Sequence, residues 1–240
     1  KHKNFPELLQ MVANRVDCFL NGPAGGGKNT AVEQAAKELN EPFNCLQLSQ
    51  LSLKSELTGY NNIVNGEFFL TSFVNAYENG GIFFADEFDN WAPTVVTSIN
   101  MAIANNFYQF PHKVIHRHKD FVFIAAGNTI GLGAENHYVT SRALSGASRD
   151  RLVFLHWPID EDLEFLMVPK EYKSWVKFVQ SCRKEADLNG GTILITPRAS
   201  IQGAKMLEIG WSKEMCFRSI VLRGQEIPSY LINVFEKYNK

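Results

Sequence analysis

Short apolar runs alternate with amphipathic segments over the first two-thirds of the 240-residue chain. Each run has the length of a buried strand, and most of the segments between them carry apolar residues at helical spacing. The expected strands are 17–20, 43–48, 82–85, 121–126 and 153–155, and the expected helices are 5–15, 30–39, 69–78 and 94–105. Strands that alternate with helices predict an α/β fold, with a parallel sheet covered by helices on both faces.

The pattern changes after Trp157 and Pro158, where the strand-like runs stop. The expected helices beyond this point are 161–167, 171–187, 198–208 and 212–222. We therefore expect a domain boundary near residue 158. It would separate a large α/β nucleotide-binding domain (1–157) from a small helical domain (158–240), sizes that suit one chain of this length.

A glycine-rich segment follows the first expected strand and opens a helix. It reads Gly22-Pro23-Ala24-Gly25-Gly26-Gly27-Lys28-Asn29-Thr30, with the G-x-x-x-x-G-K spacing of a P-loop. Glycines let backbone N–H groups converge on phosphate oxygens, and the helix N-terminus adds a favourable dipole. Lys28 would place its charge on the β and γ phosphates. The alternative is a glycine-rich connector with an incidental lysine, but the strand–loop–helix context favours ATP binding.

Asn29 departs from the P-loop pattern, which offers Ser or Thr to Mg²⁺ after the lysine. An amide oxygen can bind Mg²⁺ but lacks the compact geometry of a hydroxyl. Thr30 lies roughly 100° further round the helix and does not simply replace it. We therefore expect nucleotide binding to be retained and hydrolysis to be the more sensitive property.

Two later strands also end in polar side chains. Asp86 and Glu87 end the apolar strand 82–85, and Asn128 follows the strand 121–126. In P-loop enzymes a strand-end Asp holds the Mg²⁺ shell, while an adjacent Glu polarises the attacking water. Asn128 could orient that water. A solvated strand end for the acids, and a simple turn for Asn128, are the alternatives.

Composition narrows the class of protein. With 45% hydrophobic residues, the chain has the composition of a folded protein and not of a disordered one. Its 24 basic and 25 acidic residues exclude a protein that coats nucleic acid with a broadly basic surface, but they do not exclude a local basic surface that binds nucleic acid. The four cysteines are widely spaced and favour core thiols over disulfides. No apolar run approaches the length of a membrane helix, so we expect a soluble, cytoplasmic protein with no membrane partner.

With these motifs in order, the chain resembles an AAA+ ATPase of the MoxR-like branch, which includes the cobaltochelatase small-subunit type and relatives in phages and mobile elements. The glycine-rich loop, the F-F-A-D-E strand end (83–87) and the A-A-G-N-T strand end (125–129) carry the resemblance, which spans about 17–210. Residues 138–152 look like the arginine-bearing segment of that family, and 196–199 look like the start of its sensor-2 helix.

The resemblance implies an ATP- and Mg²⁺-dependent ATPase that forms a homo-oligomeric, hexameric ring and remodels an unidentified protein client or adaptor. In such rings an arginine of one subunit reaches the γ-phosphate of its neighbour. Arg151 is the first candidate for this finger, Arg142 the second and Arg149 the third. Arg198 would reach the nucleotide of its own subunit, with the 158–240 domain as a lid. Asp86 and Asn29 would hold Mg²⁺.

Two other functions stay open: a nucleotide-gated assembly module with weak hydrolysis, because of Asn29, and a nucleic-acid translocase. The second rests on an expected β-hairpin over 107–119, which carries His112, His116 and His118 at even spacing. Lys113, Arg117 and Lys119 add positive charge. A metal site on the histidines is a weaker option because no second shell of acids is evident around them. The polar segment 59–66 is expected to be a loop.

Overall fold

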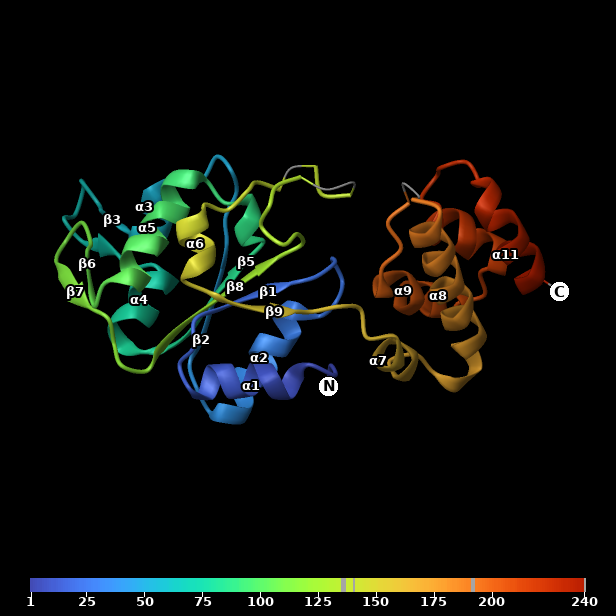
Figure 1. Cartoon of the computed structure of the whole chain (residues 1–240), viewed down its shortest axis with the longest axis horizontal. Helices are drawn as coiled ribbons and strands as arrows, with labels where there is room; N and C mark the ends of the chain where they lie inside the picture. The colour runs from blue at the N-terminus through green and yellow to red at the C-terminus, as the bar shows by residue number, and fades with distance from the viewer. Residues whose placement is uncertain (135–136, 140, 191–192, 240) are drawn as a thin grey trace. The chain divides into compact units, whose positions relative to one another are not determined.

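The computed structural model describes residues 1–134, 137–139, 141–190 and 193–239. Its chain forms two compact units, one of Lys1–Pro23 with Gly27–Pro158 and one of Ala24–Gly26 with Ile159–Lys240. The first unit contains the sheet and the second is helical (Figure 1).

A five-stranded sheet organises the first unit, in the order β2-β5-β8-β1-β9. Its strands are β1 (Cys18–Asn21), β2 (Phe43–Gln47), β5 (Gly81–Asp86), β8 (Phe121–Gly127) and β9 (Val153–His156). Every pair of neighbours is parallel. The expected α/β fold is therefore confirmed, and each expected strand agrees within one residue at either end.

Both faces of the sheet are buried, which explains why its strands are continuous apolar runs. Alternate residues of β5 point to opposite sides, with Ile82 and Phe84 in one hydrophobic cluster and Phe83 and Ala85 in another. Helices α1 and α2 cover the first side, and helices α3, α4 and α5 cover the second, with α6 beside α5 (Figure 1). Their bounds are α1 (Phe5–Ala13), α2 (Lys28–Leu39), α3 (Lys54–Thr58), α4 (Ser72–Asn79), α5 (Pro93–Ala104) and α6 (Gly146–Asp150), with the 3₁₀ turn η1 (Phe88–Asn90) after β5.

Two short antiparallel hairpins extend the first unit beyond its sheet. One joins β3 (Tyr60–Asn61) to β4 (Phe68–Phe69), and the other joins β6 (Phe107–Gln109) to β7 (Val114–His116). The second was expected, but the first was expected to be only a loop. Helix α4 begins three residues later than expected because Phe69 pairs with β3 and Thr71 caps the helix, accepting from the Val74 N–H at 3.3 Å.

The second unit is helical, in agreement with the fold class expected for the end of the chain. Its elements are α7 (Glu161–Leu166), η2 (Lys170–Tyr172), α8 (Lys173–Leu188), α9 (Pro197–Glu208), α10 (Lys213–Cys216), the π-helical turn η3 (Phe217–Val221) and α11 (Ser229–Asn239). Glu164 of α7 is buried, and it accepts hydrogen bonds from Arg183 of α8 and Ser200 of α9. This charged group therefore joins three helices.

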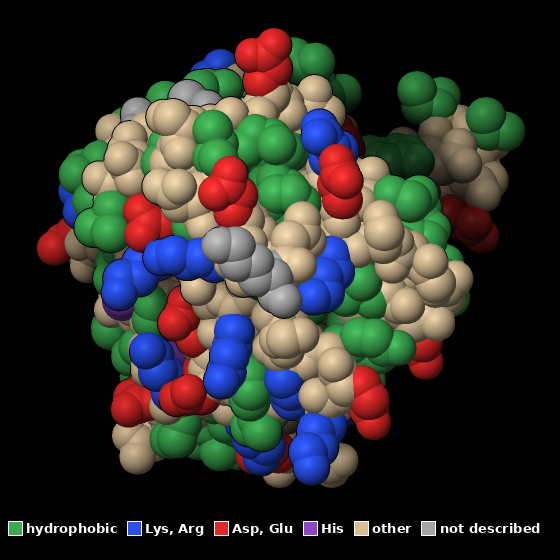
Figure 2. Space-filling model, turned by 90° about the vertical axis from the view of Figure 1, so that its right-hand side faces the viewer, with side chains coloured by type: hydrophobic (Ala, Val, Ile, Leu, Met, Phe, Trp, Pro, Cys, Tyr) green, Lys and Arg blue, Asp and Glu red, His purple; other side chains and the backbone are tan. Residues whose placement is uncertain are grey.

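The surface charges agree with the composition, and three of the four cysteines lie where the sequence predicts them. The face drawn in Figure 2 mixes basic, acidic and hydrophobic side chains, in keeping with the nearly balanced charge.

Cys18, Cys182 and Cys216 are buried as expected, and burial raises the pKa of Cys18 to about 12. The expectation is wrong for Cys45, which is exposed because β2 is an edge strand. Within the described ranges, no helix is both long and apolar enough to cross a membrane.

The basic side chains of the β6–β7 hairpin are largely engaged in ion pairs. Lys113 pairs with Glu78, and Arg117 pairs with Asp17 at 2.8 Å. Asp17 also accepts the Phe123 N–H at 2.8 Å, so it joins the hairpin to the sheet. Among the described residues there is no group of histidines, cysteines or acids that could hold a metal ion. The three histidines of the hairpin therefore do not form such a group, and two of its basic side chains are paired within the chain.

Arg117→Ala should lower the free energy of unfolding by about 2 to 3 kcal/mol, because it leaves a mostly buried carboxylate at Asp17 without its cation. Lys119→Ala, on the same segment but exposed, should change it by less than about 0.5 kcal/mol. Urea denaturation of both variants measures the difference. Equal losses would show that the ion pair contributes nothing beyond an ordinary surface charge.

Candidate functional site

The candidate site lies where three neighbouring strands of the sheet end. Strand β8 lies between β1 and β5, and all three are parallel, so their carboxyl ends share one edge. The glycine-rich segment follows β1, Asp86 ends β5, and Asn128 follows β8. Ligand sites in open α/β sheets form outside the carboxyl ends of strands, so a ligand site is expected at this edge.

Lys28 is the first residue of α2, and its side chain is buried against the loop that precedes it. Its Nζ donates to the carbonyl oxygens of Gly22 at 2.6 Å and Pro23 at 3.1 Å. It also donates to Oδ1 of Asn128 at 3.2 Å. The structure thus brings together two residues that are 100 positions apart in the sequence and that were both expected in the site.

The start of the glycine-rich loop leaves no room for a side chain. A β-carbon on Gly22 would lie 1.8 Å from the carbonyl oxygen of Trp157, which follows β9. The Trp157 N–H donates to the Asn21 carbonyl at 2.7 Å and holds the two segments together. Gly27 has a φ of +77°, a left-handed conformation that favours glycine. Packing and backbone geometry therefore explain two of the loop's glycines without reference to a ligand.

The acid pair has an unusual backbone. The Asp86 carbonyl accepts the indole N–H of buried Trp91 at 2.9 Å, and its carboxylate accepts the Glu87 N–H at 3.0 Å. Glu87 has φ 50° and ψ 40°, a left-handed conformation that costs a non-glycine residue roughly 1 to 2 kcal/mol. Both carboxyl groups are partly exposed. The surrounding contacts thus hold Glu87 in a strained conformation at the edge where the strands end.

Asp89 is a site residue that the sequence reasoning missed. It is 1% exposed, and its Oδ2 accepts from the N–H groups of Asn128 (3.1 Å) and Thr129 (3.2 Å) and from the Thr129 hydroxyl (3.0 Å). Its carbonyl accepts the Arg142 N–H at 2.9 Å. One buried carboxylate therefore fixes the loop that carries Asn128. The available signal was an acid between Phe88 and Trp91, in an apolar stretch just after the acid pair.

Asn29 and Thr30 are exposed on the first turn of α2. The Asn29 amide nitrogen lies 3.9 Å from the sulfur of Cys45, on β2. Although Cys45 is exposed as a residue, partial desolvation of its thiol, with a smaller effect from the Asp86 carboxylate, raises its pKa to about 11. When the Asn29 nitrogen faces this thiol, its oxygen remains available. The Asp86 carboxylate and the Asn29 oxygen are hard donors of the kind Mg²⁺ takes beside nucleotide phosphates, so the chemistry of this donor set fits Mg²⁺.

The candidate arginines differ in their surroundings. Arg142 and Arg151 are exposed, and the Arg151 guanidinium donates to the carbonyl of Ala147 in the first turn of α6. Arg149 lies over the Phe154 ring at 5.6 Å and is partly buried. Arg198 is exposed near the start of α9, in the second unit. Their roles toward a nucleotide remain predictions.

Comparisons with known proteins agree with this architecture. Residues 17–144 match the family model described as AAA domain (dynein-related subfamily). The chain is 28% identical over 174 residues to the aerobic cobaltochelatase subunit CobS of Sinorhizobium sp. That match covers 68% of this chain and 51% of the relative, so the chain spans about half the length of this curated relative.

Two solved structures are similar in fold. NtrX from Brucella abortus has a TM-score of 0.63 at 12% identity, with 100% of this chain and 60% of that chain covered. A protein from Cytophaga hutchinsonii assigned as an ATPase has a TM-score of 0.50 at 16% identity, with coverages of 93% and 89%. At these identities the structures bear on the fold alone. Together with the family match, they confirm the resemblance drawn from the sequence.

Asp89→Ala should lower the free energy of unfolding by about 3 kcal/mol or more, because it leaves two backbone N–H groups and a hydroxyl without their acceptor. Amide hydrogen exchange at Asn128 and Thr129 should accelerate more than exchange in α1, on the opposite face of the sheet. Asp150→Ala, at an exposed acid, should cost less than about 0.5 kcal/mol. Unchanged exchange at Asn128 would contradict the anchoring role of Asp89.

Proposed function

Because the chain belongs to the AAA domain family, in its dynein-related subfamily, we propose that it is a ring-forming ATPase that uses ATP and Mg²⁺ to remodel a protein partner. The observation that supports this most directly is the 3.2 Å contact between Lys28 and Asn128. It puts a cation and a polar amide at the edge where Asp86 and Glu87 also end a strand. A cation, acids and a polar amide are groups that P-loop enzymes use to bind phosphates and position water.

Each residue has a distinct role in the proposal. The backbone N–H groups of 22–27 and the start of α2 bind phosphate oxygens, and Lys28 moves its ammonium from the loop carbonyls to the β and γ phosphates. Asp86 and Asn29 would hold Mg²⁺, and that ion would supply positive charge to the phosphates. Glu87 takes the proton of the attacking water, and Asn128 orients that water. Asp89 positions Asn128 through its backbone.

Assembly into a ring completes the proposed site. Arg151 is exposed at the end of α6 and would neutralise charge on the γ-phosphate of a neighbouring subunit, with Arg142 as the next candidate. Arg198 would contact the nucleotide of its own subunit. CobS is named as a subunit of cobaltochelatase, which supports the proposal that this chain also works with other chains.

A second function is favoured by Asn29. Its amide stands where a hydroxyl is typical, and its nitrogen faces Cys45 rather than solvent alone. A nucleotide-gated assembly module binds ATP and hydrolyses it slowly. Such a protein would not need a hydroxyl in place of the Asn29 amide as a ligand for Mg²⁺. The nucleic-acid translocase is not favoured, because Lys113 and Arg117 already pair with acids of this chain.

Lys28→Ala and Glu87→Gln should separate binding from turnover. The first should weaken ATP binding about tenfold or more, because it removes a charge-assisted contact with the phosphates. The second should keep the affinity and lower kcat about 10²-fold or more, because an amide cannot accept the proton. Lys37→Ala, exposed on the same helix as Lys28, serves as the control. Calorimetry measures the ATP affinity, and phosphate release measures kcat. Equal kcat values for Glu87→Gln and the parent would show that Glu87 is not the base.

Arg151→Ala should leave ATP binding intact and lower hydrolysis by roughly 10³-fold if the arginine acts across a subunit interface. Mixing it with Lys28→Ala subunits should restore part of the activity, because some interfaces then pair an intact Lys28 with an intact Arg151. Native mass spectrometry verifies that mixed rings form, and Arg142→Ala is tested in parallel. Mixed rings without activity would show that Arg151 acts within its own subunit or only structurally.

A further inference from the structure

A buried ion pair joins helices α7 and α8 in the second unit. Glu164 is 2% exposed and Arg183 is 6% exposed. Two nitrogens of the Arg183 guanidinium donate to the two carboxylate oxygens of Glu164, at 2.8 and 2.9 Å. A two-pronged contact of this kind fixes the orientation of both groups as well as the distance between them. The pair is therefore a well-defined support for any segment that contacts it.

Both members of the pair also hold the start of α9. The Nε of Arg183 donates at 2.8 Å to the carbonyl oxygen of Ile195, two residues before the helix begins at Pro197. The Glu164 carboxylate accepts the hydroxyl of Ser200, which is fully buried and is the fourth residue of the helix. The ion pair thus contacts the chain on both sides of residues 196–199.

Helix α9 lacks the side-chain cap that usually fixes a helix start. Thr196 occupies the N-cap position, where a hydroxyl normally accepts a backbone N–H of the first turn, but it makes no such bond. Its hydroxyl is buried and has no hydrogen-bond partner in the part of the chain that the structure describes. Without this local cap, the position of the helix start depends on the contacts made by α7 and α8.

The start of α9 packs on the glycine-rich loop. Residues Ala24–Gly26 of that loop belong to the same compact unit as the helix. A β-carbon on Gly25 would lie 3.1 Å from the β-carbon of Thr196 and 3.6 Å from the ring of Pro197, so there is little room for a side chain between the two segments. Arg198 is the second residue of the helix and is exposed. It therefore stands where the helix meets a loop that is proposed to bind phosphates.

We propose that Glu164, Arg183 and Ser200 are positioning residues for Arg198, because they hold the start of α9 where this arginine can reach the nucleotide. None of the three would touch the nucleotide itself. The inference rests on the proposed function in taking Arg198 to contact ATP. It explains how an exposed arginine, on a helix without a side-chain cap, keeps one position.

Ser200→Ala and Arg183→Lys test the inference with little loss of volume. The first removes one hydroxyl from the cluster. The second keeps a cation beside Glu164 but lacks the planar fork that also reaches the Ile195 carbonyl. Each should weaken ATP binding about fivefold, the factor that corresponds to one net hydrogen bond, as measured by calorimetry. Each should also accelerate amide hydrogen exchange at Ala199, whose N–H donates to the Thr196 carbonyl at 2.9 Å, and leave exchange in α11 unchanged.

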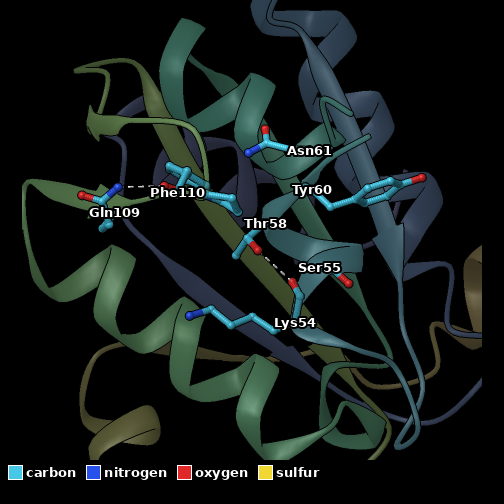
Figure 3. A pocket seen from close by; sticks show the side chains of 9 residues that line it. Lys54, Ser55, Thr58, Tyr60, Asn61, Gln109 and Phe110 are labelled. Atoms are coloured by element: carbon cyan, nitrogen blue, oxygen red, sulfur yellow. Dashed lines mark hydrogen bonds between the residues drawn. The ribbon is translucent and has the colours of Figure 1, made fainter. Parts of the chain in front are cut away.

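Thr58→Val is the matched control. Thr58 is 2% exposed, and its hydroxyl donates to the Lys54 carbonyl at 3.0 Å, beside a cavity of about 570 Å³ in the first unit (Figure 3). The substitution removes the hydrogen bond of a buried hydroxyl, as Ser200→Ala does, but at a distance in the sequence and in the other unit. It should leave both the ATP affinity and exchange at Ala199 unchanged.

Arg198→Ala completes a double-mutant cycle that separates positioning from a general loss of stability. Ser200→Ala should weaken ATP binding by less than about twofold when residue 198 is already alanine, because the contact through which it acts is then missing. An equal effect in both backgrounds overturns the inference, and so does an ATP affinity of Ser200→Ala equal to that of Thr58→Val.

Lys28→Ala in the same assay tests the proposed function separately. ATP binding that depends on Lys28 but not on Ser200 contradicts only the positioning role. A parent chain that binds no ATP contradicts both the proposed function and the positioning role that rests on it.

Discussion

The parallel pairing of β8 with both β1 and β5 is the constraint on which the candidate site depends. Asn21 pairs with Gly127, and Ala85 pairs with Ala125, so the three strands end at nearly the same level. Because successive side chains alternate between two buried faces, a slip by one residue would move apolar groups to the wrong side of the sheet. The hydrophobic cores therefore fix the register, and the register in turn brings Lys28 close to Asn128.

Two contacts made by buried side chains hold the segments at this edge of the sheet in place. Asp89 fixes the loop after β8, and Trp91 holds the carbonyl at the end of β5. Between them Glu87 keeps a left-handed backbone that an isolated peptide would rarely adopt. Both supports come from the short segment after β5. The six residues from Asp86 to Trp91 thus include a proposed Mg²⁺ ligand, the proposed catalytic base and the residues that hold their surroundings.

The sequence predicted what depends on local pattern. The strands were found because burial on both faces makes them continuous apolar runs, and Asn128 was found because it directly follows one of them. Asp89 was missed because its partners follow a different strand. The basic residues of 107–119 suggested a surface that binds nucleic acid. The sequence did not show that Arg117 is paired, because its partner Asp17 lies far away in the sequence. The exposed position of Cys45 depends on strand order, and a role for Arg151 depends on another subunit, so neither can be read from local pattern.

The position of β1 between β8 and β9 also affects how the chain folds during synthesis. Cys18 is synthesised before both of its neighbours in the sheet, Ile124 and Val153. Until the ribosome has released β9, the apolar β1 has no neighbour on that side, and the glycine-rich loop lacks the Trp157 backbone that packs against Gly22. Pairings this distant in the sequence slow folding and leave apolar strands exposed in the nascent chain. The strand that leads into the glycine-rich loop therefore stays without one of its neighbours until β9 has been synthesised.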